Sequence, residues 1–329
     1  MTATAPTRQR VRPDIVHIPD GFLDAKTALA SAALSCAGLS LAVRAVQRRL
    51  PPARVPLLGL STAFVFAAQM VNFPVVGGTS GHLLGAVLVT VLLGPAAAVL
   101  VMSAVLILQC LLFADGGLTA LGANLFNMAL VAPLVGHGVN RSVLRLWGTG
   151  LRARLFAAAF AAWCATVAAA ISCAGQLAMS GTAPWRATFP AMALIHMLIG
   201  AGEAIITALV LSGLARARPE LLTSAAETPG GSRSFVALGL LGSIGLAVFV
   251  APFACPWPDG LEKVAAVLGF EHQAAERPIL SAPLPNYTVP GLASQGGGTV
   301  IAGGVGTLAA FALTWWLARR LTRGQRGTV

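Results

Sequence analysis

Long apolar stretches recur along almost the whole chain, and they constrain its fold more than any other feature. Of the 329 residues, 56% are hydrophobic and only 10% are charged, whereas a typical soluble domain carries about 25% charged residues. A membrane-spanning helix needs about 20 mostly apolar residues. The sequence therefore predicts an all-α, polytopic membrane helix bundle with about nine spans. The predicted spans cover residues 27–46, 55–73, 83–93, 95–113, 118–139, 155–178, 190–214, 235–252 and 299–318.

The apolar run over residues 83–113 is too long for one ordinary span. Gly94-Pro95 interrupts it, and proline removes a helical hydrogen bond. We therefore predict a short span over 83–93, followed by a full one over 95–113. Short membrane segments broken by Gly or Pro often lie beside a binding site.

The basic residues predict the orientation in the membrane. In a soluble protein the net charge of +11 would suggest a nucleic-acid partner, but in a membrane protein Lys and Arg gather on the cytoplasmic side. If the N-terminus is outside, fifteen basic residues fall inside: Arg44, Arg48, Arg49, Arg54, Arg141, Arg145, Arg152, Arg154, Arg216, Arg218, Arg233, Arg319, Arg320, Arg323 and Arg326. Seven fall outside: Arg8, Arg10, Arg12, Lys26, Arg186, Lys263 and Arg277. This excess predicts that the N-terminus is outside and the C-terminus inside, and it removes the need for a nucleic-acid partner.

Composition also divides the chain into parts. We interpret a polar stretch over residues 215–234 as a cytoplasmic linker between a seven-span domain (16–214) and a two-span domain (235–329). Residues 1–15 are basic but lack an apolar core, so they do not form a signal peptide. The five cysteines form no C-x-x-C pair, and we predict neither a disulfide framework nor a zinc site. A P-loop for ATP is also missing from the sequence.

Two histidine motifs fall on the predicted outer face. The first is His17-Ile18-Pro19-Asp20-Gly21-Phe22-Leu23, just before the first span, and the second is Gly78-Thr79-Ser80-Gly81-His82, at the head of the short span. A histidine entering the membrane is costly unless it has a partner, so His82 is a functional candidate. Two imidazoles without thiolates suit nickel, copper, cobalt or zinc. The alternative interpretations are a solvated loop histidine for His17 and satisfaction by backbone carbonyls for His82.

The outer loop between the last two spans contains a third motif, Pro258-Asp259-Gly260-Leu261-Glu262. Asp259 and Glu262 have the spacing of a capping box, and Gly269 is placed to end the helix that they start. This pattern predicts a short amphipathic helix packed on another part of the molecule. We expect His272 to be a solvated loop residue.

Two other functions rest on single features. Gly78-Thr79-Ser80-Gly81, with His196 as base, fits an intramembrane serine protease, although so short a match is common in a Gly-rich chain. Glu203, deep within a span, would fit an ion-coupled secondary transporter, or it pairs only with Asn side chains or with a helix end. Asn124 and Asn127 are weaker candidates, and His137 and His196 are expected to pack between helices.

Together these motifs closely resemble the cobalt/nickel substrate-capture membrane component of energy-coupling factor (ECF) transporters, the CbiM/NikM type, over about residues 16–214. The Pro258–Glu262 loop resembles the two-span N-type (PDGLE) partner, fused here over about 235–320. The resemblance implies capture of Ni²⁺ or Co²⁺ as the transported ligand, with no cofactor. It also implies a T-type membrane coupling subunit and two cytosolic ABC ATPases as partners, so that this chain in the plasma membrane is not itself an enzyme.

The resemblance further implies a metal site at the extreme N-terminus. Its ligands would be a terminal amine at Val16, the amide and ring of His17, and the ring of His82, with Asp20, Asn72 and Ser80 in support. Four nitrogens in a plane favour nickel(II) or copper(II). This sequence departs from the family because fifteen residues precede Val16, and a peptide nitrogen cannot replace an amine. We expect that translation starts at Val16; if the leader is retained, water or Asp14 would be the fourth ligand, and affinity would be lower.

Overall fold

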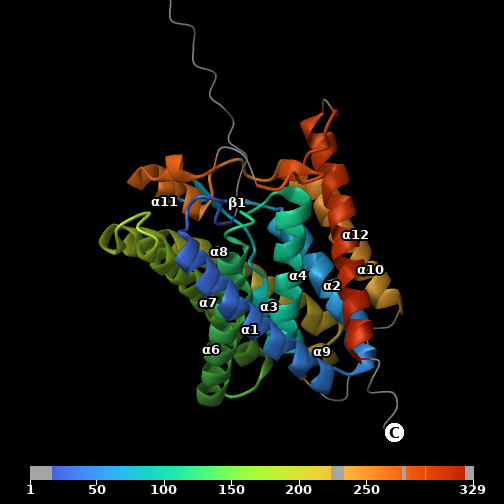
Figure 1. The fold of residues 1–329 in the computed structure, drawn as a ribbon. Coiled ribbons are helices and arrows are strands. Elements are labelled where there is room, and N and C mark those ends of the chain that lie inside the picture. The colour runs from blue at the N-terminus through green and yellow to red at the C-terminus, as the bar shows by residue number, and fades with distance from the viewer. Residues whose placement is uncertain (1–16, 224–232, 276–278, 293, 323–329) are drawn as a thin grey trace, which may run out of the picture.

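Each of the nine apolar stretches is mostly helical in the computed structural model, which describes residues 17–223, 233–275, 279–292 and 294–322. The helices form one bundle with a single short β-hairpin near one end (Figure 1). Within the described residues, six helices are long and apolar enough to cross a membrane: Ala25–Arg49, Pro95–Phe113, Leu151–Met179, Trp185–Ala217, Arg233–Phe253 and Gly296–Thr322. The other helical segments are shorter or interrupted, so the total of nine crossings stays a prediction.

Helix α1 (Ala25–Arg49) begins where its sequence indicates. The side chain of Asp24 accepts a hydrogen bond from the Thr27 amide, and Arg48 and Arg49 occupy the last turn, where positive charge complements the helix dipole. Its buried residues lie on one face, and the rest of the helix is open to the surroundings of the bundle. An apolar helix with one buried face is suited to a position at the lipid boundary.

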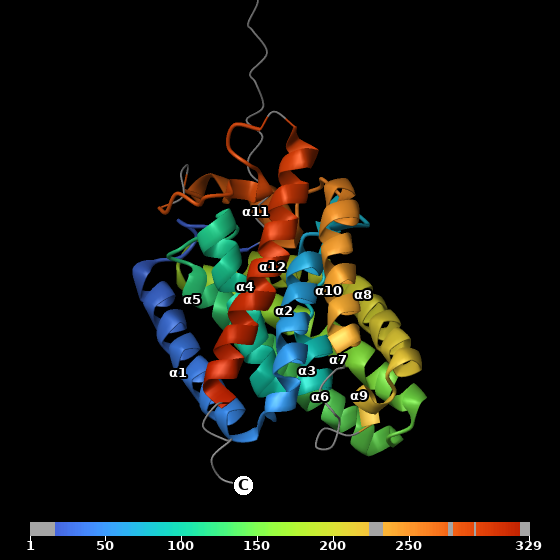
Figure 2. The same cartoon turned by 90° about the vertical axis from the view of Figure 1, so that its right-hand side faces the viewer.

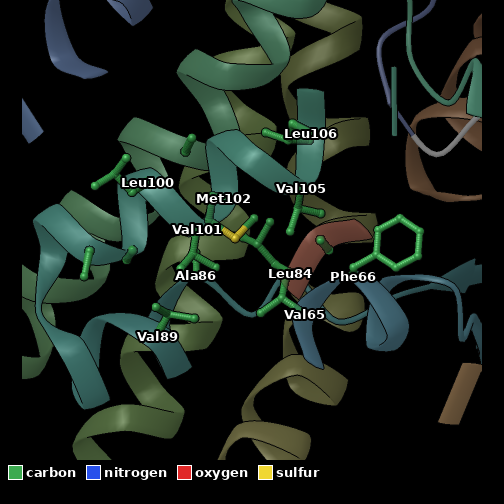
Figure 3. Close-up of a cluster of buried hydrophobic side chains, with 14 of the residues drawn as sticks. Val65, Phe66, Leu84, Ala86, Val89, Leu100, Val101, Met102, Val105 and Leu106 are labelled. Carbon is green, nitrogen blue, oxygen red and sulfur yellow. The ribbon is translucent and has the colours of Figure 1, made fainter. Parts of the chain in front are cut away.

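The centre of the bundle is formed by α2 (Val55–Gln69), α3 (Ala86–Leu93) and α4 (Pro95–Phe113). Figure 3 shows their side chains interlocking in one buried cluster, which includes Phe66, Val89 and Met102. Gly94 separates α3 from α4 with a φ of 87°, and Pro95 begins α4. The predicted break is confirmed, and it leaves α3 as a short helix of 8 residues.

The next helical segment is less regular than the sequence predicts. Helix α5 (Leu121–Asn124) continues into a π-helical segment, η2 (Leu125–Val131), and then into α6 (Ala132–Trp147). Asn127, within the π-helical segment, donates to the side chain of Gln176 at 2.7 Å and accepts from Ser172 at 2.7 Å. Polar side chains thus pair between helices where the backbone departs from α-helical geometry.

Helices α7 (Leu151–Met179) and α8 (Trp185–Ala217) form a long hairpin. Alanines at positions 157, 158, 161, 162 and 165 of α7 are all fully buried, and such small residues allow helices to approach closely. A short helix, α9 (Glu220–Thr223), follows α8.

The C-terminal part packs directly onto the first domain. Helix α10 (Arg233–Gly245), its π-helical continuation η3 (Leu246–Val250) and α12 (Gln295–Thr322) all lie against α2, as Figure 2 shows for α10 and α12. Between them, α11 (Gly260–Leu268) lies across the end of α8. The capping box of Asp259 and Glu262 and the left-handed Gly269 that ends α11 are as predicted.

The two ends of the described chain lie at opposite ends of the bundle. The start of α1, the hairpin and α11 are at one end, and the end of α12 and α9 are at the other (Figure 1). This arrangement is compatible with an N-terminus outside and a C-terminus inside. Which end faces the cytoplasm stays a prediction from the basic residues.

Glu203, the acidic residue in α8, is fully buried, and two hydrogen bonds to backbone amides explain how its carboxylate is accommodated there. One carboxylate oxygen accepts from the Leu84 amide at 2.6 Å and the other from the Gly85 amide at 2.9 Å. These amides precede α3, whose cap residue Gly85 has no capping side chain. Glu203 therefore neutralises the positive end of α3 and fixes the loop that carries His82.

Candidate metal site

The segment after residue 16 is held inside the molecule. The Ile18 amide donates to Oδ1 of Asn124 at 3.0 Å, and Nδ2 of Asn124 donates back to the Ile18 carbonyl at 3.1 Å. The same carbonyl accepts from the Gly117 amide at 2.9 Å. His17 is only 3% exposed, so the interpretation as a solvated loop histidine is wrong.

Asp20 supports the site by fixing this segment. Its Oδ1 accepts from the amide and the hydroxyl of Thr119, at 2.8 and 2.6 Å. Its carbonyl accepts from the Ala275 amide at 2.8 Å, so the outer loop of the C-terminal domain also holds the turn. Asp20 thus acts on the backbone that carries His17 rather than on the cavity next to it.

The two nitrogens of the His17 ring have different surroundings. Nδ1 lies 2.8 Å from Oδ1 of Asp115, whereas Nε2 is buried and has no hydrogen-bond partner among the described residues. A histidine that donates Nδ1–H to a carboxylate keeps the lone pair of Nε2 for a metal, as metal-binding histidines commonly do. A buried nitrogen without a partner is otherwise costly.

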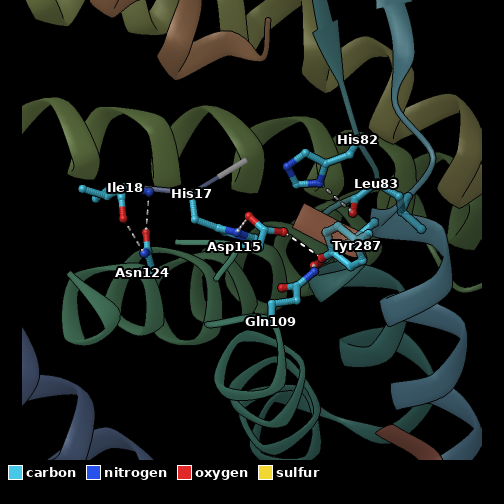
Figure 4. Close-up of polar contacts among 9 residues, drawn as sticks. His17, Ile18, His82, Leu83, Gln109, Asp115, Asn124 and Tyr287 are labelled. Atoms are coloured by element: carbon cyan, nitrogen blue, oxygen red, sulfur yellow. Dashed lines mark hydrogen bonds and ion pairs between the residues drawn. The ribbon is translucent and has the colours of Figure 1, made fainter. Parts of the chain in front are cut away.

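His82 approaches His17 from the β-hairpin. Strands β1 (Phe73–Val75) and β2 (Thr79–Gly81) pair antiparallel, with Phe73 opposite Gly81, and His82 follows directly. The two imidazole rings have centroids 6.1 Å apart, tilted by 56°. Nδ1 of His82 lies 3.2 Å from the Leu83 carbonyl (Figure 4). The alternative interpretation of His82, satisfaction by backbone carbonyls, therefore holds for one of its two ring nitrogens. Nε2 is left for a ligand.

The surroundings keep His82 neutral. Burial, together with repulsion from His17, lowers the pKa of His82 to about 4. A neutral imidazole has the free lone pair that a metal requires.

Asp115 and Tyr287 extend the hydrogen-bond network of His17, and neither lies in one of the sequence motifs. Burial would raise the pKa of the Asp115 carboxyl, but attraction to His17 and hydrogen bonds from His17 and Tyr287 outweigh it, so the pKa lies below its usual value. The hydroxyl of Tyr287 donates to Oδ2 of Asp115 at 2.8 Å, and burial beside this carboxylate raises the pKa of Tyr287. One signal was present: Asp115 is an acidic residue directly after an apolar span, in a chain with only 11 acidic residues.

A cavity of about 100 Å³ lies between the two histidines and the helices behind them. Its wall includes His17, His82, Ser80, His196 and Asp259. Asp259 comes from the outer loop, so the C-terminal domain helps to close the cavity. Asn72 is not part of the wall; its carbonyl accepts from the Cys255 amide at 2.9 Å, which ties the start of the hairpin to the same loop.

Ser80 and His196 are not arranged as a nucleophile and its base. The Ser80 hydroxyl donates to the Trp257 carbonyl at 2.8 Å, and Nδ1 of His196 contacts the Met192 carbonyl at 2.8 Å. The Ser80 amide donates to the Pro258 carbonyl at 2.8 Å. Ser80 therefore joins the hairpin to the Pro-Asp-Gly loop, and the hydroxyl proton is already committed to a carbonyl.

The described side chains provide only part of a coordination sphere. Within the described ranges, no group of three or more His, Cys, Asp or Glu residues is placed to hold a metal, so His17 and His82 need further ligands. Val16 and Asp14 lie outside the described residues. A chelate through the amide and ring of His17 closes through Nδ1, the ring nitrogen nearer the backbone, and that mode requires the ring to leave Asp115.

A close backbone contact makes the site sensitive to one glycine. A Cβ atom on Gly117 would lie 2.2 Å from the Asp20 amide nitrogen and 2.6 Å from its Oδ1, far inside van der Waals contact. We expect Gly117→Ala to displace the His17 segment and to weaken metal binding about tenfold, although no ligand is removed. Calorimetric titration with Ni²⁺ would measure this. Gly138→Ala is the matched control, since its Cβ meets nothing within 4 Å, and equal binding by the two variants would contradict the expectation.

Comparisons with known proteins show the family of this chain. Residues 17–221 match the CbiM family model, described as the cobalt uptake substrate-specific transmembrane region, and residues 233–323 match the PDGLE domain. The chain belongs to the CbiM/NikM family and is fused to a PDGLE domain. It is therefore a multi-pass plasma-membrane component of metal transport, and the predicted family is confirmed.

Two relatives that are named as fused proteins match most of the chain. The putative fused nickel transport protein NikMN of Archaeoglobus fulgidus is 40% identical over 306 residues, which cover 92% of this chain and 98% of the relative. The fused nickel transport protein NikMN of Rhodobacter capsulatus is 36% identical over 251 residues, 72% of each chain. A crystal structure of a truncated transition metal transporter aligns with a TM-score of 0.56 at 34% identity, covering 61% of this chain and 99% of that one.

Proposed function

We propose that this chain is the substrate-capture component of an ECF-type ABC importer, and that it binds Ni²⁺ or Co²⁺ at the outer face for ATP-driven uptake. The observation that carries the proposal is the pair of imidazoles, His17 and His82, whose ring centroids lie 6.1 Å apart in the wall of one cavity. Nitrogen ligands suit these two metals. The names of the fused relatives make nickel the preferred cargo.

The ligands of this site are proposed to be the amide and ring of His17, the ring of His82 and, in a chain that begins at residue 16, the amine of that residue. Asp20 fixes the His17 segment, and Ser80 and Asn72 connect the hairpin to the outer loop. The partners are a T-type membrane coupling subunit and two cytosolic ABC ATPases, since the sequence of this chain contains no P-loop.

Transport assays separate this proposal from ion-coupled transport through Glu203. We expect vesicles that hold the chain alone to accumulate no radioactive nickel, and vesicles that hold the full four-part complex to accumulate it when ATP is supplied on the ATPase side. Accumulation by the chain alone, driven by an ion gradient and lost in Glu203→Gln, would contradict the proposal. Chelators would abolish uptake here but would leave a serine protease unaffected.

A further inference from the structure

The segment that joins the hairpin to α3 has no regular secondary structure. Residues 82–85 lie between β2 and α3, so their backbone polar groups need partners other than a strand or a helix. The Leu84 amide donates to Oε2 of Glu203 at 2.6 Å, and the Leu84 carbonyl accepts from Nε2 of Gln69 at 3.0 Å. The Gly85 amide donates to the other carboxylate oxygen of Glu203 at 2.9 Å. Two side chains therefore hold both polar backbone groups of Leu84.

These two side chains come from different helices and are themselves fixed. Glu203 in α8 is 1% exposed, and Gln69 at the end of α2 is 2% exposed. Oε1 of Gln69 accepts from Nε2 of Gln109 at 2.9 Å, which ties the pair to α4 as well. Hydrogen bonds in such a place are costly to break, because a polar group would be left unpaired away from water. We call Glu203 and Gln69 together the Leu84 clamp.

Leu84 connects the clamp to the metal cavity. Its side chain belongs to the buried cluster of Figure 3, and the residue also lines the cavity, as His82 does. Nδ1 of His82 contacts the carbonyl of Leu83, directly before Leu84. Among the described residues, the cavity wall includes neither Glu203 nor Gln69, so the clamp acts on the site through the backbone. A backbone that is fixed two residues from His82 limits the directions in which its ring can reach a metal.

A carboxylate is a costly side chain to place here. Glu203 is the only acidic residue within the nine predicted spans, and no basic side chain forms an ion pair with it in the described part of the chain. A charged group within the membrane is expensive and tends to mark function. Its two oxygens can accept from two successive amides at once, whereas the amide of a glutamine has a single acceptor oxygen. The segment is therefore held more firmly than a neutral side chain could hold it.

We propose that Glu203 is a positioning residue of the metal site and that it acts on His82 through the Leu84 clamp. The inference rests on the proposed function and gives the buried carboxylate a role in metal capture instead of ion coupling. With both amides bound, the segment is rigid, and the His82 ring is in place before the metal arrives. Without the carboxylate, the ring must be ordered at the expense of binding free energy.

Titration of the full chain tests the effect on the metal. We expect Glu203→Gln, which keeps one acceptor oxygen, to weaken Ni²⁺ and Co²⁺ binding about tenfold in calorimetry. The visible absorption spectrum of the bound nickel should also shift, because the His82 ring is less well oriented. Thr207→Val is the matched control, one turn further along α8. Thr207 is fully buried and its hydroxyl has no hydrogen-bond partner among the described residues, so binding should be unchanged.

Hydrogen exchange in the metal-free chain tests the route through the backbone. Glu203→Gln should speed exchange in a peptide that covers residues 82–85, and a peptide over residues 17–23 should stay as protected as in the parent chain. Gln69→Met removes the partner of the Leu84 carbonyl, and we expect it to loosen residues 82–85 and to weaken binding as well. If Glu203→Gln does not fold, the same two measurements on Gln69→Met decide.

Three results would overturn the proposal. The first is unchanged or tighter nickel binding in the folded variant, and the second is unchanged exchange over residues 82–85. The third is faster exchange along the whole chain, with a lower melting temperature and an unchanged nickel spectrum, since the loss of binding would then be general destabilisation.

The same titrations distinguish the inference from the function on which it depends. If His82→Ala binds metal normally, the proposed function fails, whatever Glu203→Gln does. If His82→Ala loses binding while Glu203→Gln keeps it, only the role of Glu203 fails.

Discussion

Replacing either His17 or His82 with alanine is expected to abolish metal binding by the purified chain. Each change removes one of the two imidazoles that face each other at 6.1 Å. Among the described residues, no group of three or more His, Cys, Asp or Glu side chains is placed to hold a metal. Because loss of an outer partner alone costs 10–100-fold in affinity, we expect loss of a ligand to cost about a hundredfold or more. Calorimetric titration with nickel and cobalt would measure it, and metal uptake should be lost in parallel.

Two variants control this experiment. His272→Ala removes an exposed histidine at the same end of the molecule, whose Nδ1 contacts the Gly269 carbonyl, and binding should not change. Ser80→Ala removes a hydroxyl that donates to Trp257, so it should weaken binding far less than either histidine change. Normal metal binding by both His17→Ala and His82→Ala would exclude the proposed site. Loss of function only in Ser80→Ala would favour the protease.

Removing residues 1–15, with Met in place of Val16, is expected to tighten nickel binding at least tenfold. The change converts a peptide nitrogen, which is a poor ligand, into a free amine directly before His17. The amine and the His17 amide then join the two imidazoles, and nickel(II) favours such a set of four nitrogens. The measurement is a titration of the two chains side by side, with intact mass confirming the first residue of each.

A chain that starts with Met in place of Asp14 is the matched control for that truncation. It loses most of the leader but keeps its amine two residues too far away, so it should bind like the full chain. If it binds as tightly as the chain that starts at residue 16, the gain comes from loss of the leader and not from the amine. Equal affinity of all three would contradict the role of the residue 16 nitrogen.

The site shows which contacts a sequence can predict. His17 and His82 were found because each lies in a short, chemically distinctive motif, and their membrane setting makes an idle histidine costly. Asp115 and Tyr287 were not found, because their contacts join residues 98 and 172 positions apart. Glu203 was found as an acidic residue within a span, but its partners were not, because its carboxylate reaches amides more than a hundred positions away. No local pattern in the sequence encodes such a pairing.

The sequence by itself determined where the helices lie, because apolar length, the Gly94-Pro95 break and the caps at Asp24 and Asp259 act through neighbours in the chain. Tertiary packing decided where α2 ends and which distant residues meet at His17. Helix α2 ends at Gln69, four residues before the predicted end of its span, because the chain there turns into a hairpin that the Pro258 loop pairs with. Tertiary contacts also bring the PDGLE loop to His17 through Asp115 and Tyr287. A histidine becomes a defined metal ligand only when distant groups fix its tautomer and exclude water, and the folded chain brings those groups together.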